Sequence, residues 1–399
     1  MASHPRVAIV TGMLKLGGSS IFVHNLGLEL IQRGLPVVII SGEADYRLDP
    51  TLQQSLRPVL LNDRSVIFED RVEQALSHLR AFEPDVVIAN LGHFSFEILR
   101  YLPDGISRIA MVHSDDPNVY RSLTPYAPYI DTIVGVSRKI VRRLQEISAF
   151  SRIHKTCVPC GIPMPANVRR TPRKNSELRI LYLGRLDREQ KRVDRLPLVA
   201  EKLQNSGRNF QWTFAGDGPN RLQLEKQMKQ LAPNVRPTFH GAVEYAKIGS
   251  IIEEHDVFVL VSDFEGLPLS LVEAMAYGLV PVVTDLESGV RDVVDSTTGY
   301  LVRSDDIDGY AAAILWLDEH RDELEAKSNA ASNRVAQEFS AKAMLERWLP
   351  LLPPHAVSAK WPARFNISGV LNDSWWKFLP FVRQARRFLK QRSRGSATI

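Results

Sequence analysis

Cysteine is scarce in this sequence, and none of its hydrophobic runs is long. Cys157 and Cys160 are the only two cysteines in 399 residues, which argues against a disulfide scaffold. Their C-x-x-C spacing lacks the two further ligands of a structural zinc site, so we expect a structural or incidental role. No apolar stretch approaches the roughly 20 residues that span a bilayer, and residues 1–6 hold no apolar core of a signal peptide. The sequence therefore predicts a cytoplasmic protein.

The remaining composition is that of a globular protein with more than one domain. Apolar residues make up 44% of the chain and charged residues 24%. A length of 399 residues exceeds one ordinary hydrophobic core, so we expect two domains with a cleft between them. Residues 165–176 are rich in Pro, Arg and Lys, which is typical of an interdomain linker.

Short apolar runs alternate with helical patterns along both halves of the chain. Such alternation predicts two Rossmann-like, doubly wound parallel sheets. We expect strands at 7–11, 36–41, 85–89, 109–112, 132–136, 178–183, 210–215, 238–241, 256–262 and 281–284. We expect helices at 20–33, 69–82, from 138, at 306–320, 321–339 and 341–352, and loops at 90–96, 120–129 and 298–300.

Residues 256–285 organise the predicted site because they form a strand, a loop, a helix and a second strand. Pro268 suits the first turn of the helix, and Gly278 suits a left-handed helix stop. The loop 263–267 would lie at the carboxyl end of a parallel strand, where open α/β sheets bind ligands. Glu265 in this loop and Glu273 in the helix can accept hydrogen bonds from hydroxyl groups, while the helix N-terminus attracts anions. This combination suits a sugar nucleotide.

The stretch 262–283, S-D-F-E-G-L-P-L-S-L-V-E-A-M-A-Y-G-L-V-P-V-V, resembles the signature of retaining glycosyltransferases of family 4, which have the GT-B fold. The resemblance covers roughly residues 6–352. It implies that Glu273 binds the ribose hydroxyls and that Glu265 lies at the donor sugar. The loop amides of Gly266 and Leu267 would line the sugar and phosphate pocket.

Other loops carry further residues of the resembling pattern. The turn G-M-L-K-L-G-G after the first strand would face the donor diphosphate through Gly17 and Gly18. The pattern also implies that His113 reaches the donor sugar. In the second domain, it implies that Gly184, Arg185 and Lys191 clamp the diphosphate and that Val243 lies in a loop beside the base. Residues 159–163 resemble the family's Pro-Asn-Gly-Val hinge, with Cys160 in the place of the Asn.

The chemistry implied by the resemblance needs no metal and no cofactor beyond a UDP- or GDP-linked sugar as donor substrate. Fixed cations and helix dipoles would stabilise the departing diphosphate. Asp115 and Asp116 also suggest a D-x-D-like metal site or an inverting base, although metal sites of that kind belong to another glycosyltransferase fold. We expect a hexosyltransferase-type enzyme (EC 2.4) that transfers the sugar with retention in glycan, polysaccharide or glycolipid assembly. The alternatives are a sugar-nucleotide epimerase on the same fold and a catalytically silent binding protein.

The predicted domains are an acceptor-side domain at 1–165, a linker at 166–177, a nucleotide-sugar domain at 178–339, a crossover helix at 340–354 and a basic tail at 355–399. The tail carries a formal charge of +8 against +5 for the whole chain, so the rest is at −3. It holds three of the six tryptophans, and residues 381–390 have an amphipathic helical pattern. Such a tail fits either an anionic membrane surface, near a lipid-linked acceptor, or the enzyme's own body. We expect no nucleic-acid partner.

Overall fold

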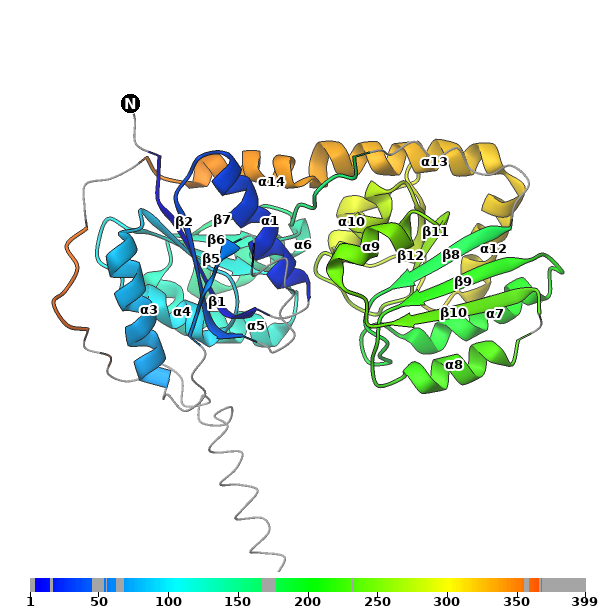
Figure 1. Cartoon of the computed structure of the whole chain (residues 1–399), viewed down its shortest axis with the longest axis horizontal. Helices are drawn as coiled ribbons and strands as arrows, with labels where there is room; N and C mark the ends of the chain where they lie inside the picture. The colour runs from blue at the N-terminus through cyan, green and yellow to red at the C-terminus, as the bar shows by residue number, and fades with distance from the viewer. Residues whose placement is uncertain are drawn as a thin grey trace, which may run out of the picture.

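Two parallel sheets, each covered by helices, form two lobes that lie side by side (Figure 1). This computed structural model describes residues 4–14, 17–44, 54, 56–61, 68–166, 177–231, 233–354, 359–365 and 367. The predicted linker therefore lies mostly outside the described residues, as does most of the predicted tail.

The first domain has a seven-stranded sheet in the order β3-β2-β1-β4-β5-β6-β7, with all strands parallel. Its strands are β1 (Val7–Leu14), β2 (Val37–Ala44), β3 (Val59–Leu60), β4 (Val86–Ala89), β5 (Ser107–Val112), β6 (Thr132–Gly135) and β7 (His154–Cys157). Its helices are α1 (Gly18–Gln32), α3 (Phe68–Phe82), α4 (Gly92–Leu99), α5 (Pro117–Leu123) and α6 (Arg138–Glu146).

The second domain has a six-stranded parallel sheet in the order β10-β9-β8-β11-β12-β13. Its strands are β8 (Leu178–Leu183), β9 (Phe210–Ala215), β10 (Val235–Gly241), β11 (Val257–Leu260), β12 (Val280–Thr284) and β13 (Tyr300–Val302). Its helices include α7 (Leu196–Gln204), α8 (Arg221–Lys229), α9 (Tyr245–Ile252), α10 (Leu269–Ala276), α11 (Gly289–Val293) and α12 (Ile307–Glu319). The prediction of two Rossmann-like sheets is confirmed.

Strand order reverses between β1 and β4 in the first sheet and between β8 and β11 in the second. Ligands of open α/β sheets bind at such a reversal, beyond the carboxyl ends of the strands. The buried strands β4 and β11 are both Val-rich and fully enclosed, as expected of parallel strands covered on both faces. At the end of α10, Gly278 adopts a left-handed φ of 78° and ends the helix as predicted.

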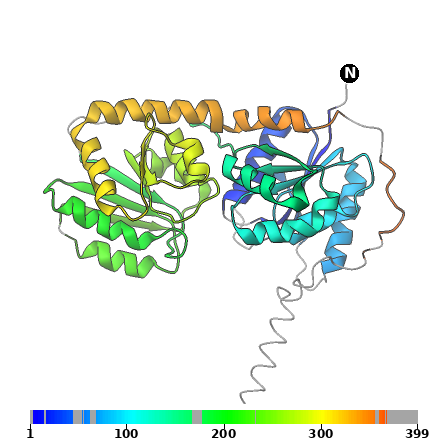
Figure 2. The same ribbon diagram turned by 180° about the vertical axis from the view of Figure 1, so that it is seen from behind.

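A long helical segment crosses from the second domain back to the first (Figure 2). It consists of α13 (Arg321–Arg334), a π-helical turn (Val335–Phe339) and α14 (Ala341–Trp348). Ile162 donates a backbone hydrogen bond to Phe339 at 3.0 Å and accepts one from Ala341 at 2.7 Å. Trp348 packs on Phe22 of α1 with ring centroids 6.1 Å apart, so α14 belongs spatially to the first domain.

Two predicted loops are wrong, and a third is right only for residues 298 and 299. Tyr300 begins β13, which pairs with β12. Most of 90–96 belongs to α4, and 120–129 is divided between α5 and a 3-10 helix (Thr124–Tyr129). The prediction failed because β13 is short, and because α4 and α5 are stabilised by packing on the sheet more than by a regular local pattern.

Residues 359–365 and 367 are the described part of the predicted tail. Arg80 of α3 donates to the backbone carbonyls of Pro362 (3.3 Å) and Ala363 (3.2 Å). Trp361 and Phe365 pack against the core of the first domain. This part of the tail lies on the protein's own body, and the predicted amphipathic helix at 381–390 lies outside the described residues. Among the described helices, none is long and apolar enough to cross a bilayer.

Candidate active site

The loop after β8 is built around the buried carboxylate of Asp187. One of its oxygens accepts from the backbone N–H groups of Gln190 (2.8 Å) and Lys191 (3.3 Å), and the other accepts from Nε of Arg185 at 2.6 Å. Burial alone would raise the pKa of Asp187, but these N–H donors and the Arg185 charge outweigh it and lower the pKa. Asp187 therefore stays ionised and holds the two predicted diphosphate cations on one loop.

Arg185 and Lys191 differ in their surroundings. The side chain of Arg185 is mostly exposed and is held by Asp187 and by Oε1 of Gln190 at 3.0 Å. Lys191 is largely buried, and its Nζ donates to Oε1 of Glu265 at 2.7 Å. Because an ammonium group has three N–H donors, this ion pair leaves Lys191 two donors for another acceptor.

The loop after β11 is joined to the loop after β8. The backbone N–H of Asp263 donates to the carbonyl of Gln190 at 2.9 Å, and Nε2 of Gln190 donates to the carbonyl of Phe264 at 3.1 Å. Asp263 also pairs with Arg192 and Arg195, each at 2.7 Å. These contacts fix the loop that carries Glu265 against the loop that carries Lys191, across the strand-order reversal.

The N-termini of α1 and α10 meet between the domains. Gly17 is the N-cap of α1, and its carbonyl accepts from the backbone N–H groups of Ser20 and Ile21. A Cβ built on Gly18 would lie 3.4 Å from the side chain of Leu269, the first residue of α10. Two helix N-termini, one from each domain, thus bring partial positive charge to the same place.

Gly266 lies directly against the first domain. A Cβ on this residue would come within 2.1 Å of the carbonyl oxygen of His113, so no other residue fits without a backbone shift. The carbonyl of Gly266 accepts from the N–H of Gly289 at 2.7 Å, and Leu267 packs beside Gly289. Gly184 lies across the loop, where an added Cβ would be 3.9 Å from Cε of Lys191.

The His113 side chain, at the end of β5, is oriented by neighbours in its own domain. Nδ2 of Asn90 donates to the carbonyl of Ser19 at 3.4 Å, so Oδ1 of Asn90 accepts from Nε2 of His113 at 2.7 Å. Nδ1 of His113 then faces the thiol of Cys160, with Sγ 3.8 Å away. Burial lowers the pKa of His113 to about 4, so the imidazole is neutral at pH 7. Phe22 contacts the ring edge to face, with centroids 5.1 Å apart.

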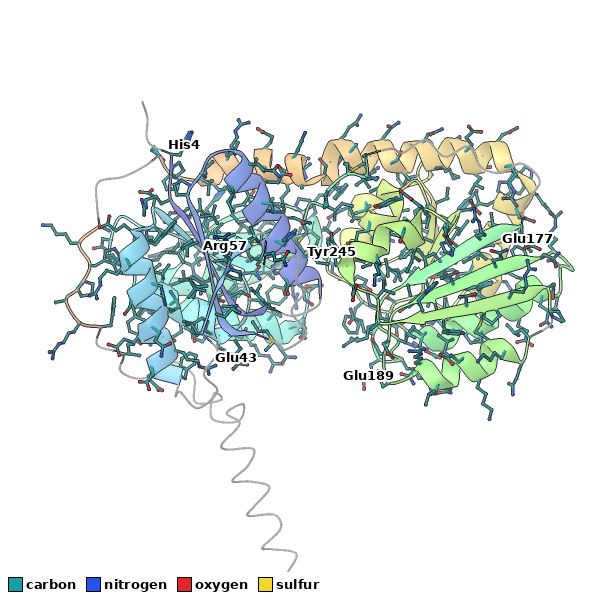
Figure 3. All side chains as sticks on the ribbon, in the orientation of Figure 1. His4, Glu43, Arg57, Glu177, Glu189 and Tyr245 are labelled. Carbon is teal, nitrogen blue, oxygen red and sulfur yellow. The ribbon has the colours of Figure 1, made fainter. Side chains whose placement is uncertain are left out.

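Glu273 is the fifth residue of α10 and is buried. Its Oε1 atom has no hydrogen-bond partner among the described residues. Burial raises the pKa of Glu273 to about 8, and a hydrogen bond from the Tyr245 hydroxyl partly offsets this effect. Tyr245 begins α9 on the side that faces the first domain (Figure 3). The half-buried Val243 lies two residues earlier, in the loop that leads into α9. Glu273 is therefore a buried carboxyl with one acceptor oxygen to spare.

The structure brings the predicted residues into a group that spans both domains. His113, Gly266, Glu265, Lys191 and Gly184 are linked by direct contacts. Gly18 approaches Leu269 at the start of α10, with Gly17 next to it in the chain, and Arg185, Val243, Leu267 and Glu273 lie on the surrounding loops and on α10.

Three residues with evident roles in the site are not among those predicted from the sequence. Asn90 orients His113 and follows β4 directly, so the rule of strand ends could have found it. Tyr245 contacts Glu273, and Cys160 contacts His113. No sequence signal identifies these two contacts, because each joins separate segments of the chain.

Asp115 and Asp116 have partners that account for them. Asp115 accepts from the Tyr120 hydroxyl at 2.7 Å and pairs with Lys139 at 3.0 Å. Asp116 is the N-cap of α5 and accepts from the backbone N–H of Asn118 at 2.8 Å. Among the described residues, no group of three or more His, Cys, Asp or Glu side chains could hold a metal ion.

Two Rossmann-like domains, a returning C-terminal helix and a site between the strand ends define the GT-B fold of glycosyltransferases. A family model described as Glycosyl transferases group 1 matches residues 164–334, and one described as Glycosyltransferase Family 4 matches residues 16–164. The chain belongs to this family of group 1, family 4 glycosyltransferases.

Similar proteins agree with this assignment. The chain is 30% identical over 175 residues to the GalNAc-alpha-(1->4)-GalNAc-alpha-(1->3)-diNAcBac-PP-undecaprenol alpha-1,4-N-acetyl-D-galactosaminyltransferase of Campylobacter jejuni, covering 43% of this chain and 47% of that protein. It is 27% identical over 297 residues to the putative colanic acid biosynthesis glycosyltransferase WcaL of Escherichia coli, covering 68% and 71%. The match spans less than half the length of most of the curated relatives.

A solved structure shows the same fold. HepE of Anabaena in complex with UDP and glucose superimposes with a TM-score of 0.70 at 15% identity, covering 88% of this chain and 99% of that one.

Proposed function

We propose that this protein transfers a sugar from a nucleotide-diphosphate donor to an acceptor hydroxyl, with retention at the anomeric carbon, in glycan or glycolipid assembly. The observation that carries the proposal is the buried Oε1 of Glu273, which has no partner among the described residues. A buried carboxylate oxygen is costly without a donor, and the two hydroxyls of a ribose are suitable donors. The nearby cations and helix N-termini supply what the diphosphate of the same ligand needs.

The proposed chemistry assigns separate roles to the cations. The leaving nucleoside diphosphate gains negative charge, which Arg185 and Lys191 stabilise together with the N-termini of α1 and α10. Each cation contributes on the order of 2 to 4 kcal/mol to lowering the barrier. Lys191 keeps its bond to Glu265 and offers its two remaining N–H groups to phosphate oxygens.

Retention follows from front-face departure and attack, in which the leaving phosphate helps to take the acceptor proton. His113 is neutral at pH 7, so in this scheme it contacts the donor sugar as a hydrogen-bonding group and adds no charge. NMR of the first-formed product would test this scheme, because an inverted anomeric configuration contradicts it.

The donor is proposed to be a UDP- or GDP-linked sugar. The Anabaena neighbour was solved with UDP and glucose, which favours a UDP-sugar. The acceptor is proposed to be a sugar or a lipid-linked glycan, since the Campylobacter relative is named for a PP-undecaprenol acceptor. The donor would be a substrate, with no further cofactor.

Metal independence is part of the proposal because the fixed cations supply the positive charge that a divalent ion would otherwise bring. Turnover is measured before and after exhaustive EDTA treatment. Complete loss that Mn2+ or Mg2+ restores would contradict the proposal, whereas unchanged turnover would support it.

A cytoplasmic protein that docks on the inner face of a membrane through residues 355–399 is the proposed location. The net charge of +8 and three tryptophans in that tail support it, since each cation near an anionic surface is worth about 1 kcal/mol. Flotation with anionic liposomes compares the full chain with a chain that ends at Pro354. Equal binding by the two proteins would contradict a membrane role of the tail, whose described part packs on the first domain.

One experiment separates the proposed transferase from its alternatives. A thermal-shift panel of UDP- and GDP-sugars first identifies the donor, because a ligand at 100 times its dissociation constant adds roughly 2.7 kcal/mol to stability. The labelled donor is then incubated with lipid-linked and free glycan acceptors. Label in the acceptor supports the transferase, formation of a donor epimer supports an epimerase, and binding without either product supports a silent binding protein. Glu273→Gln is the matched variant with reduced donor binding.

A further inference from the structure

A cavity lies between the domains, beside the group of donor-site residues. Its volume is about 390 Å3, within the range of about 300 to 1,000 Å3 that small-molecule sites occupy. One wall is formed by the turn before α5, by α5 itself and by α6 of the first domain. Glu287, from the loop after β12, completes the lining from the second domain.

This cavity is close to the proposed position of the donor sugar. Asp115 in its first-domain wall is two residues from His113, and Glu287 is two residues from Gly289. Both His113 and Gly289 contact Gly266 through its backbone. A group held in the cavity is therefore next to the loop that would hold the donor sugar.

The charged side chains of the cavity balance one another. Lys139 pairs with Asp115 at 3.0 Å, Arg142 with Glu287 at 2.8 Å, and Arg143 with Glu146 at 2.8 Å. Three cations and three carboxylates leave no net charge to attract an anion. They still offer spare N–H donors and spare oxygen lone pairs, which is what hydroxyl groups require.

Two of the three pairs are also easy to open. The side chains of Arg142 and Glu287 are 60% and 61% exposed, and Arg143 and Glu146 are similarly exposed. Exposed ion pairs contribute little, so a ligand can take their hydrogen-bonding groups at small cost. Asp115, in contrast, is held by both Tyr120 and Lys139 and presents a fixed acceptor at the wall.

We propose that this cavity is the acceptor subsite and that it takes a neutral, polyhydroxylated sugar, with Asp115 and Arg143 as specificity-determining residues. The inference rests on the proposed glycosyl transfer, of which the sugar in this cavity would be the acceptor end. An anionic group, such as a sugar acid or a phosphate, would meet no net positive charge in the cavity.

Saturation-transfer NMR with the full chain tests the proposal, first with UDP bound and then without it. The probes are neutral methyl glycosides of common hexoses and N-acetylhexosamines, with methyl glucuronide and inorganic phosphate as anionic probes. We expect at least one neutral glycoside to bind saturably. Its affinity should change little between about 0.05 and 0.5 M NaCl, because screening acts mainly on charged ligands.

The variants Asp115→Asn and Arg143→Gln leave the interdomain pair Arg142 to Glu287 intact. Each should weaken the glycoside about tenfold, as expected for a lost hydrogen bond to a charged group, while UDP affinity stays the same. Arg33→Gln removes an equally exposed cation of the first domain, outside the cavity, and should bind the glycoside like the unmodified protein.

Three results would overturn the inference. They are absence of binding by every neutral glycoside, unchanged glycoside binding in both cavity variants, and preferential, salt-sensitive binding of an anionic probe. Failure of the proposed function has a different signature, since it would appear as a protein that binds no nucleotide sugar or transfers no label to any acceptor.

Discussion

Donor binding should depend on pH through Glu273. Its pKa of about 8 in the free protein means that roughly one tenth of the molecules carry the ionised carboxylate at pH 7. Ribose hydroxyls bond more strongly to the carboxylate than to the protonated acid. Donor binding therefore requires loss of a proton, which costs about 1.4 kcal/mol for each pH unit below the pKa. The dissociation constant should fall about tenfold per unit as pH rises toward 8 and become constant above it.

Isothermal titration calorimetry with the nucleotide sugar, without acceptor, measures this dependence. A diphosphate esterified at both ends lacks the ionisation near pH 6 of a phosphate monoester, so the ligand adds no titration of its own. Repeating the titration at pH 7 in buffers of different ionisation enthalpy should show release of nearly one proton.

Two variants define the origin of the effect. Glu273→Gln should bind independently of pH and, above pH 8, about 1.5 to 3 kcal/mol more weakly than the unmodified protein. Tyr245→Phe removes the hydrogen bond that lowers the pKa of Glu273, so the plateau should begin at higher pH. A flat profile in the unmodified protein, or a break that persists in Glu273→Gln, would refute the assignment of the proton to this carboxyl.

Further predictions concern stability and individual side chains. In the free protein, the raised pKa of Glu273 makes the folded state hold a proton that the unfolded chain loses. The free energy of unfolding should therefore fall as pH rises from 4.5 to about 8. A thermal-unfolding series should show a smaller fall in Glu273→Gln. Lys191→Ala should lower kcat by about 100-fold or more while donor affinity changes less, and a rate close to that of the unmodified protein would contradict its role. Cys160→Ser should retain transfer, because burial raises the pKa of this thiol and excludes a thiolate, and because a serine hydroxyl can also donate to His113. A variant that binds the donor but does not turn over would disprove this. Gly266→Ala should reduce transfer, since the new methyl group clashes with the carbonyl of His113. The clash should also push the domains apart and increase the radius of gyration measured by small-angle scattering. An unchanged radius and rate would show that the loop carrying residue 266 shifts instead.

The regular elements could be predicted because their signals are local. The strands at 178–183 and 210–215 match β8 and β9 residue for residue, since each is a short run of mostly apolar residues that is buried in the sheet. The end of α10 at Gly278 follows from the conformational freedom of glycine. The short strand β13 was missed because its three residues form a strand only through pairing with β12.

The site could be predicted as a set of residues but not as a set of contacts. Strand ends and the family pattern identified Lys191 and Glu265, yet nothing in the sequence shows that the two form a buried ion pair. The contact between Cys160 and His113 depends on how β5 packs beside the segment that leaves the first domain. Such pairings are set by tertiary packing, for which periodicity and spacing carry no signal.

The return of α14 to the first domain determines where this chain can be recombined with its relatives. Trp348 is packed on Phe22, and Ile162 hydrogen-bonds to the backbone on both sides of Ser340, so α14 forms part of the first domain. A hybrid that exchanges everything after the linker would match a foreign helix to the native α1. One that exchanges only residues 177–339 keeps that interface intact and cuts the chain where the π-helical turn ends and α14 begins.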